Sequence, residues 1–259
     1  CGKEAFAQAV HQASQRSGKP FVAVNCASIP ESLIESELFG YRGGSFTGAR
    51  KEGMRGKLQQ ADGGTLLLDE IAEMPLLLQA KLLRVIQEGR IRPVGGDEEV
   101  AVDVRIIAAT HQNLDQLVGT SQFRADLFFR LETFTLHIPP LRERADDLEL
   151  LAQHFLAQLK QKQPANVHSI SSDALDCLYR YPFPGNVREL QNALERAYTF
   201  AASHEIKPED LPERIAGYQG KSATPQQASD TSWPSLQQVQ HNYMRQVLQH
   251  TNGNKQQAA

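Results

Sequence analysis

Two adjacent carboxylates, Asp69 and Glu70, come directly after a short, largely apolar stretch at residues 63–68. The stretch is too short for a typical helix and has no polar alternation, so it predicts a strand buried on both faces of a parallel sheet. Ligands of open α/β sheets bind beyond the carboxyl ends of the strands. There, the first acid is suited to hold Mg²⁺, directly or through water, and the second to polarise an attacking water. A solvated acidic turn after a buried strand is the alternative that this stretch alone leaves open.

A Gly-Lys-Glu sequence at residues 2–4 precedes apolar residues whose spacing predicts an amphipathic helix. Gly2 and Lys3 are similar to the end of a phosphate-binding loop, in which backbone N–H groups, a lysine and a helix N-terminus surround phosphate oxygens. Glu4 takes the place of the Ser or Thr that usually binds the metal. A Gly-Lys pair also begins many ordinary helices, so the pair alone is a weak indication. The apolar positions of the predicted helix are Ala5, Phe6, Ala9, Val10 and Ala13.

Two further apolar stretches, 20–24 and 104–109, predict strands that also end in polar residues. Asn25 follows the first stretch, and Thr110 and His111 follow the second. Asn25 either faces the same site as the two carboxylates or caps its own turn, and the residues do not decide between these. His111 is expected to be a solvated loop residue, because no second ligand stands at metal spacing.

Arg124 and Arg130 lie in a stretch, 122–131, whose apolar residues predict a helix. Arginines on a helix surface are usually solvated or paired with carboxylates. They also stabilise charge on a transferring phosphoryl group, often from a neighbouring subunit. A last strand is predicted at 134–138, before a Pro-Pro pair closes the α/β part.

A glycine-rich loop is predicted at residues 40–56, which have neither a helical nor a strand period. Phe46 lies within it, between Gly44 and Gly48. An aromatic residue on a mobile loop is a candidate contact for a partner protein. The alternative is an ordered loop that packs Phe46 against its own core.

The C-terminal part of the chain is helical in pattern. Helices are predicted at 146–162 and 172–181. A third begins at a capping-box sequence, in which Asn186 is the N-cap and Glu189 follows three residues later. Arg188 lies in the first turn of that helix, where a cation opposes the helix dipole, and this placement indicates a phosphate partner.

Composition excludes several classes of protein. The chain has 259 residues and a formal net charge of −3, so any nucleic-acid binding must be local. Cys1, Cys26 and Cys177 have neither metal-ligand nor disulfide spacing, which indicates a reducing, cytoplasmic location. No apolar run approaches the length of a membrane span and no signal peptide is recognisable, so no membrane partner is expected. The chain does not begin with Met, and we expect it to be part of a longer protein.

Together these features resemble the central domain of bacterial sigma-54-dependent transcription activators, the enhancer-binding proteins of the AAA+ ATPase class. The resemblance begins at residue 1 and extends to about residue 216. The family contacts the sigma factor through a Gly-Ala-Phe-Thr-Gly-Ala loop, and this chain has serine in place of the first alanine. The similar residues here are Gly44, Ser45, Phe46, Thr47, Gly48 and Ala49.

The resemblance implies a role for each residue singled out above. Gly2, Lys3 and Glu4 are similar to the end of the Walker A loop, and Asp69 and Glu70 to the Walker B pair. His111 stands where many members have asparagine. Asn25 matches the family residue that switches the Walker B glutamate, and Thr110 matches its first sensor. Arg124 and Arg130 match the arginine-finger region, and Arg188 matches the second sensor.

The implied fold is α/β: an AAA+ P-loop core with a parallel sheet at 1–140, a small helical lid at 141–216 and a flexible linker at 217–235. Residues 236–259 resemble part of a Fis-type helix-turn-helix without its recognition helix. Within that part, the DNA-binding positions are Asn254, Lys255 and Gln256.

The implied function is ATP hydrolysis with Mg²⁺ between the subunits of a homo-oligomeric ring, expected to be a hexamer. Hydrolysis would move the Phe46 loop against sigma-54 RNA polymerase holoenzyme and promote opening of promoter DNA, while the complete C-terminal domain binds enhancer DNA. Because Cys1 lies inside the predicted phosphate loop, we expect residues 1–259 alone to hydrolyse ATP negligibly. The alternatives are a DNA-binding regulator that does not hydrolyse ATP, and an AAA+ remodelling ATPase of another class.

Overall fold

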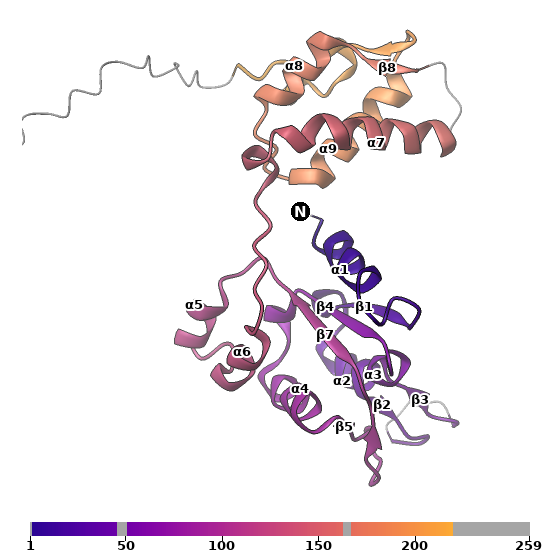
Figure 1. Ribbon diagram of the computed structural model, residues 1–259, viewed down its shortest axis with the longest axis vertical. Helices are drawn as coiled ribbons and strands as arrows, with labels where there is room; N and C mark the ends of the chain where they lie inside the picture. The colour runs from indigo at the N-terminus through magenta and orange to yellow at the C-terminus, as the bar shows by residue number, and fades with distance from the viewer. Residues whose placement is uncertain (1, 46–50, 163–166, 220–259) are drawn as a thin grey trace, which may run out of the picture. The chain divides into compact units, whose positions relative to one another are not determined.

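The chain forms two compact units, drawn as ribbons in Figure 1. The computed structural model describes residues 2–45, 51–162 and 167–219. The first unit is built from the residues up to Ala145 together with Pro184–Glu189, and the second from Asp146–Phe183 and the residues after Glu189. In these described ranges, no helix is both long and apolar enough to cross a membrane. Most of the predicted linker and the whole of the predicted helix-turn-helix lie outside them.

A parallel sheet in the order β1, β4, β7 forms the centre of the first unit. The strands are β1 Phe21–Asn25, β4 Thr65–Asp69 and β7 Arg105–Ala109, close to the three stretches that the sequence predicts. The register places Asn25 opposite Asp69, and Asp69 opposite Ala109. The residues that follow these strands therefore emerge at one edge of the sheet.

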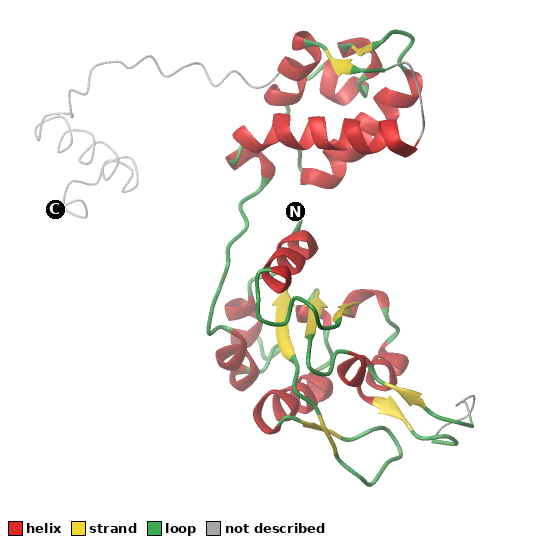
Figure 2. Cartoon of the chain, turned by 45° about the vertical axis from the view of Figure 1, so that its right-hand side comes forward, coloured by secondary structure: helices red, strands yellow, loops and turns green. Residues whose placement is uncertain are grey.

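The first unit contains α-helices and short 3₁₀ turns in addition to its strands (Figure 2, helices in red and strands in yellow). The α-helices are α1 Lys3–Gln12, α2 Glu31–Phe39, α3 Lys57–Gln60, α4 Leu76–Glu88, α5 Leu114–Gly119 and α6 Ala125–Leu131, and the 3₁₀ turns are η1 Cys26–Ser28, η2 Ile71–Glu73 and η3 Leu141–Glu143. Pro75 precedes α4, and Gly89 follows it with a φ of 64°. A proline before the first turn and a left-handed glycine after the last are the signals that predict this helix.

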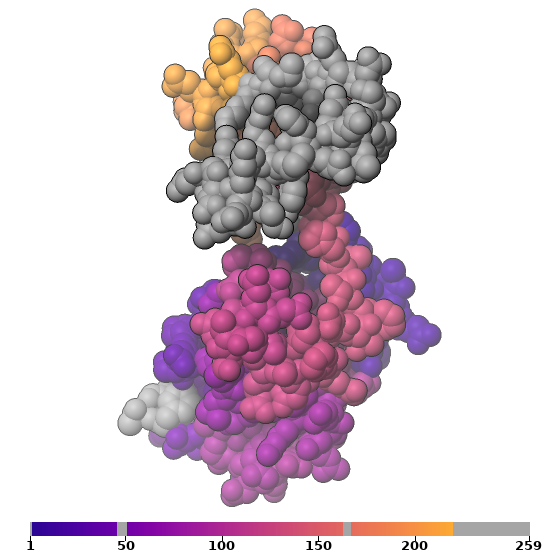
Figure 3. Space-filling model, turned by 90° about the vertical axis from the view of Figure 1, so that its left-hand side faces the viewer, coloured from indigo at the N-terminus to yellow at the C-terminus, as the bar shows by residue number. Residues whose placement is uncertain are grey.

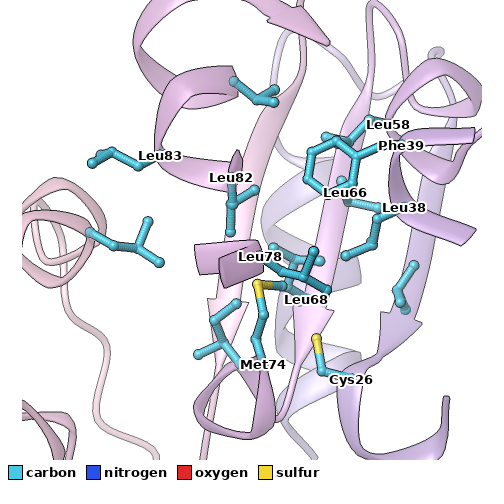
Figure 4. Packing of buried hydrophobic residues seen from close by; sticks show 14 of the residues in the cluster. Cys26, Leu38, Phe39, Leu58, Leu66, Leu68, Met74, Leu78, Leu82 and Leu83 are labelled. Atoms are coloured by element: carbon cyan, nitrogen blue, oxygen red, sulfur yellow. The ribbon is translucent and has the colours of Figure 1, made fainter. Parts of the chain in front are cut away.

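The two faces of β4 pack against different helices. Leu66 and Leu68 belong to a hydrophobic cluster that also contains residues of α2 and α4 (Figure 4). On the alternate side, Thr65 Oγ1 lies 2.9 Å from Nδ1 of His11 in α1. Because side chains alternate along a strand, β4 is buried on both faces, as its sequence predicts.

The buried face of α1 differs from the prediction. Phe6 and Val10 are 42% and 38% exposed, whereas Ala7 and His11 are buried. His11 can occupy this face because its ring bonds the Thr65 hydroxyl and packs at 5.2 Å from the ring of Phe21. The face of α1 that is buried thus contains a hydrogen-bonded histidine in place of the apolar residues that the helical spacing predicted there.

Two short antiparallel ribbons extend from the first unit: β2 Gly40–Tyr41 with β3 Met54–Arg55, and β5 Arg90–Ile91 with β6 Val100–Ala101. The second ribbon lies where the sequence predicts a hairpin, with strands at 91–94 and 99–102 on either side of the turn Gly95-Gly96-Asp97. The first corrects the prediction that 40–56 contains no strand, since the two ends of this stretch pair with each other. The tip of the loop, 46–50, lies outside the described residues.

The strand predicted at 134–138 does not form. Phe134 is 95% exposed and Leu136 66% exposed. A strand needs a neighbour that supplies backbone hydrogen bonds, and within the described chain no strand pairs with this stretch. An alternating apolar pattern was therefore insufficient to predict a strand here.

The second unit is mainly helical, as predicted. Its helices are α7 Asp146–Lys162, α8 Ser172–Arg180, most of α9 Asn186–Phe200 and α10 Glu213–Ala216, with the turn η4 Pro208–Asp210. A short parallel pair, β8 Ser169–Ile170 with β9 Glu205–Ile206, was not predicted. Leu178 of α8 and Leu194 of α9 are fully buried, so the apolar faces of these helices form the core of the unit.

Asn186 does not cap α9 in the predicted way. Its backbone has a φ of 53°, and its Oδ1 accepts a hydrogen bond of 2.9 Å from the backbone N–H of Leu141. Glu189 Oε2 accepts one of 2.8 Å from the backbone N–H of Gly185. In the predicted capping box, Glu189 would accept a hydrogen bond from the backbone N–H of Asn186. It instead accepts one from the preceding residue, Gly185, and the Asn186 side chain is bonded to the start of η3.

Candidate functional site

The end of β4 turns sharply into η2 at Glu70. Glu70 has a φ of 52° and a ψ of 50°, a left-handed conformation that is uncommon for residues other than glycine. Such strained backbone occurs preferentially at functional sites. The turn keeps the side chains of Asp69 and Glu70 at the carboxyl edge of the sheet, next to the residues that follow β7.

Lys3 lies at this edge, together with both carboxylates. Gly2 precedes α1 with a φ of 86°, and Lys3 is the first residue of the helix. Lys3 Nζ lies 2.8 Å from Glu70 Oε1 and 3.7 Å from Asp69 Oδ1. Glu4, the next residue, is exposed. The structure thus brings together the residues predicted to hold phosphates, metal and water.

His111 contacts the other oxygen of Glu70. Its Nδ1 lies 2.7 Å from Oε2, and its backbone N–H donates to the same oxygen at 3.3 Å. Burial alone would raise the pKa of Glu70, but the hydrogen bonds from Lys3 and His111 and the charge of Lys3 lower it overall. Glu70 is therefore ionised at neutral pH. His111 is an exposed loop residue, as expected, and its contact with Glu70 was not predicted.

Asp69 has an unused ligand atom. Its Oδ1 is buried and, among the described residues, has no hydrogen-bond partner. It lies 3.7 Å from Lys3 Nζ, and a buried carboxylate oxygen without a hydrogen bond fits a cation or a water bound to one. The described residues contain no cluster of three or more His, Cys, Asp or Glu side chains that could hold a metal. A site with one or two carboxylates is one in which Mg²⁺ is often held together with substrate phosphates.

Asn25 and Thr110 form local hydrogen bonds at the ends of β1 and β7. Asn25 Oδ1 accepts from the backbone N–H of Ala27 at 3.0 Å and caps η1. Of the two possibilities left open for Asn25, the structure shows the cap. Thr110 Oγ1 accepts from the backbone N–H of Gln112 at 3.0 Å. Both side chains lie at the carboxyl edge of the sheet, as Asp69 and Glu70 do, but neither forms a hydrogen bond with Glu70.

A small pocket lies beside this edge, between η1, α2 and η2. Its volume is about 180 Å³, and Cys26, Ile34 and Glu73 are among its lining residues. It is smaller than the roughly 300 Å³ at which drug-sized ligand sites begin, and neither Lys3 nor Glu70 lines it. Burial, with the nearby charges of Asp69 and Glu70, raises the pKa of the Cys26 thiol to about 12. Its thiol is therefore protonated and unreactive at neutral pH.

The two arginines of the predicted finger region are exposed on α6 and the residue before it. Figure 3 views the first unit from the side on which α5 and α6 lie. Arg124 precedes α6 and bonds Asp126 through Nε at 3.0 Å and Nη2 at 2.6 Å. These hydrogen bonds lower the pKa of Asp126. Arg130 forms no ion pair with any described residue.

Gln79 holds the chain before α6 in place. It is fully buried in α4. Its Nε2 donates to the carbonyl of Met74 at 2.8 Å, and its Oε1 accepts from the backbone N–H of Arg124 at 2.8 Å. The position of the arginines is thus tied to the same helix that packs on β4. A polar residue among the leucines of a helix was the sequence signal that could have identified Gln79.

The remaining predicted site residues are placed less completely. Gly44 has a φ of 78°, and the Ser45 hydroxyl lies within hydrogen-bonding distance of two carbonyls, those of Arg42 and, at 3.0 Å, Val94. Phe46, Thr47, Gly48 and Ala49 lie outside the described residues, so neither interpretation of Phe46 is tested. Arg188 is exposed in the first turn of α9, and its sensor role stays a prediction.

Residues 1–137 match the family described as the sigma-54 interaction domain. Residues 142–228 match the AAA+ ATPase lid domain. The chain belongs to the sigma-54 interaction domain family. Its fold is therefore the AAA+ α/β fold followed by a helical lid, as the resemblance implied.

Similar proteins support membership of the sigma-54 interaction domain family over the whole chain. The chain is 46% identical to response regulator protein PilR of Pseudomonas aeruginosa over 261 residues, and 44% identical to transcriptional regulatory protein GlrR of Escherichia coli over 260 residues. The solved structure of NtrX from Brucella abortus in complex with ATP is 32% identical, with a TM-score of 0.73. Each match covers 100% of this chain but only 56–58% of the similar protein.

Proposed function

We propose that this chain is the ATP-hydrolysing part of a transcription activator that remodels sigma-54 RNA polymerase holoenzyme and promotes formation of the open promoter complex. Membership of the sigma-54 interaction domain family supports the partner, and the ATP complex of NtrX supports the nucleotide. The observation that carries the proposal is the meeting of Lys3, Asp69 and Glu70 at the edge of the sheet, where Asp69 Oδ1 forms no hydrogen bond with any described residue.

Each of these residues suits one task in phosphoryl transfer to water. The ammonium of Lys3 would leave the carboxylates for the phosphates of ATP, together with the N-terminus of α1 and residues Gly2 and Glu4. Asp69 would hold Mg²⁺, which neutralises charge on the phosphates. Glu70, released from Lys3, would accept a proton from the attacking water. Thr110 and Arg188 would report whether nucleotide is bound.

The arginines would act on a neighbouring copy of the chain. Arg124 and Arg130 are exposed on one side of the first unit, and Lys3 and Glu70 come from other elements. Arginines that complete a site in trans are a recurrent arrangement in phosphoryl transfer. A closed ring of identical subunits, which we propose to be a hexamer, would pair each hydrolysis site with the arginines of the next copy.

The organisation of the whole protein follows from the same reasoning. We assign residues 1–140 to the ATPase core, 141–216 to the lid, 217–235 to a linker and 236–259 to the start of a helix-turn-helix that binds enhancer DNA. The loop of residues 44–49 would contact the sigma factor through Phe46, in the cytoplasm. Asn25 would act on Glu70 once nucleotide binding has released its cap on η1.

The test is Phe46→Ala in the full-length protein, with Phe200→Ala, an exposed aromatic of α9, as the matched control. Truncating an aromatic anchor of an interface costs on the order of 2 kcal/mol or more in binding. We expect Phe46→Ala to hydrolyse ATP within about 1 kcal/mol of the normal barrier, but to lose sigma-54 binding and promoter opening. The control should retain all three. Promoter opening at the normal rate by Phe46→Ala would refute the proposed partner contact.

A further inference from the structure

Phe129 exposes most of its side chain on the surface of α6. It is 71% exposed, whereas the preceding residue, Phe128, is buried. Residues three and four apart share a face of a helix, and Phe129 and Arg130 lie three and four residues after Asp126. The carboxylate of Asp126 is also the partner of Arg124. The exposed aromatic ring and the two arginines therefore belong to one surface of the first unit.

The pocket between η1, α2 and η2 has the size of a single aromatic ring. Its volume is about 180 Å³, and an apolar cavity of about 150 Å³ is large enough to bind benzene. Two exposed carboxylates, those of Glu31 and Glu73, also line the pocket. It therefore suits an aromatic side chain that is accompanied by positive charge. Its apolar lining residues include Ala27, Ile29, Ile34 and Pro75.

This pocket lies directly beside the carboxyl edge of the sheet. Cys26 lines it and follows Asn25, whose register partner in β4 is Asp69. Glu73 ends the η2 turn that follows Glu70, and its backbone N–H donates to the Glu70 carbonyl at 3.0 Å. A side chain bound in the pocket would therefore lie against the turn that holds Glu70.

We propose that Phe129 of one copy of the chain binds in this pocket of the next copy, and that the contact places Arg130 at the neighbour's Glu70. Under the proposed function, on which this inference rests, the arginines of one copy act on the hydrolysis site of another. A ring of identical subunits needs a contact between two different patches of the same chain. Arginines accompany Phe129, and carboxylates surround the pocket, so the two patches are complementary in charge as well as in size.

Photo-crosslinking identifies what Phe129 touches and does not depend on ATP hydrolysis. In the full-length protein, p-benzoylphenylalanine replaces Phe129, and ¹⁵N-labelled and unlabelled copies are mixed before assembly and illumination. We expect linked peptides that join residue 129 to residues 26–34 or 73–77 of a copy with the other label. The absence of such links, or links within one copy only, would overturn the inference. The same replacement at Phe200, the matched control, should give no link to these two segments.

The result of the photo-crosslinking is separable from the proposed function. The predicted links in a protein that neither hydrolyses ATP nor binds sigma-54 would support the docking contact and refute only the proposed function. An active protein without the predicted links would refute only the docking contact.

The energetic test measures self-association of the full-length protein by sedimentation velocity. Truncation of an aromatic anchor weakens an interface strongly, so we expect Phe129→Ala to raise the dissociation constant at least about tenfold. Phe129→Leu keeps an apolar side chain and should stay within about threefold of the wild type. Leu150→Ala, at an exposed apolar residue of α7, is the matched control and should change the constant less than about twofold.

The pocket itself is tested by Ala27→Trp, whose indole would fill it. We expect the same loss of association as in Phe129→Ala, and less than about twofold further loss when the two substitutions are combined, because they remove one contact. Since Phe129 does not touch ATP, the ATPase activity of Phe129→Ala should recover at high protein concentration, whereas that of Arg130→Ala should not. Normal association of Phe129→Ala, or low activity of Phe129→Ala at every concentration, would contradict the inference.

Discussion

The two groups of candidate catalytic residues in this chain are held in different ways. Around Glu70, side chains from three distant parts of the sequence meet: Lys3 at the start of α1, Asp69 at the end of β4 and His111 after β7. In the arginine region, Arg124 is bonded to Asp126, two residues away, and both side chains are 43–45% exposed.

Under the proposed function, this difference separates groups that would work within one copy of the chain from groups that would work between copies. Long-range contacts fix Glu70 to the sheet: the Lys3 and Glu70 side chains are 21% and 20% exposed, although the His111 side chain is 68% exposed. Exposed ion pairs are weak because solvent screens them, so Arg124 could exchange Asp126 for a phosphate at little cost. Under the proposed function, the group around Glu70 would be prearranged within one copy and the arginines would be available to a neighbouring copy.

The largest expected effect is that of Glu70→Gln in the full-length protein. The amide cannot accept the proton of the attacking water, and general-base catalysis contributes about 10²–10⁴-fold. We expect turnover to fall by at least about a hundredfold, while nucleotide binding, measured by titration with a fluorescent ATP analogue, is kept.

Glu73→Gln is the matched control, because Glu73 is an exposed carboxylate at the end of the same turn. It should hydrolyse ATP normally. If Glu70→Gln turned over ATP as fast as Glu73→Gln, Glu70 would not be the base.

The next largest effect is expected on stability, for Gln79→Ala. Gln79 belongs to α4 and connects this helix to the arginine region through its hydrogen bond with Arg124. Gln79→Ala removes a fully buried amide and leaves the Met74 carbonyl and the Arg124 N–H without their partner. We expect the free energy of unfolding to fall by about 1–3 kcal/mol in urea denaturation. Gln87→Ala, at an exposed position of the same helix, should change it by less than about 0.5 kcal/mol. Equal stability of the two variants would show that Gln79 does not hold the arginine region.

The smallest effect is expected for Asp126→Asn. The amide can still accept a hydrogen bond from Arg124 but loses the charge, and the pair is exposed. Because solvent screens such exposed pairs, we expect ATPase activity within about fivefold of normal. A loss above about fiftyfold in steady-state assays would mean that Asp126 belongs to the site itself, and the contrast between the two regions would be wrong.

The parts of the site that the sequence predicted well depend on chain topology. Apolar stretches that end in polar residues predict parallel strands, and parallel strands bring Asn25, Asp69 and Thr110 to one edge whatever the side-chain details. The meeting of Lys3 with this edge was available only through the resemblance to a phosphate-binding loop.

The parts that were missed depend on individual side-chain partners. His111 contacts Glu70 because of the turns after β4 and β7, which no spacing rule specifies. The strand predicted at 134–138 was wrong because no described strand pairs with these residues. The cap predicted at Asn186 was wrong because its side chain bonds the backbone N–H of Leu141 instead. In each case the outcome depends on which hydrogen-bonding partners lie nearby in the folded chain. The spacing of residues along the sequence does not contain this information.

The central claim, that the two regions form one hydrolysis site only when two copies meet, is tested by mixing inactive variants of the full-length protein. Arg130→Ala retains Glu70, and Glu70→Gln retains Arg130. In a ring assembled from equal amounts of both, roughly a quarter of the interfaces combine a good Glu70 with a good Arg130. We therefore predict that ATPase activity reappears at roughly a quarter of the wild-type rate, and that mixing Arg130→Ala with the double variant restores nothing. No activity in verified mixed assemblies would contradict the account.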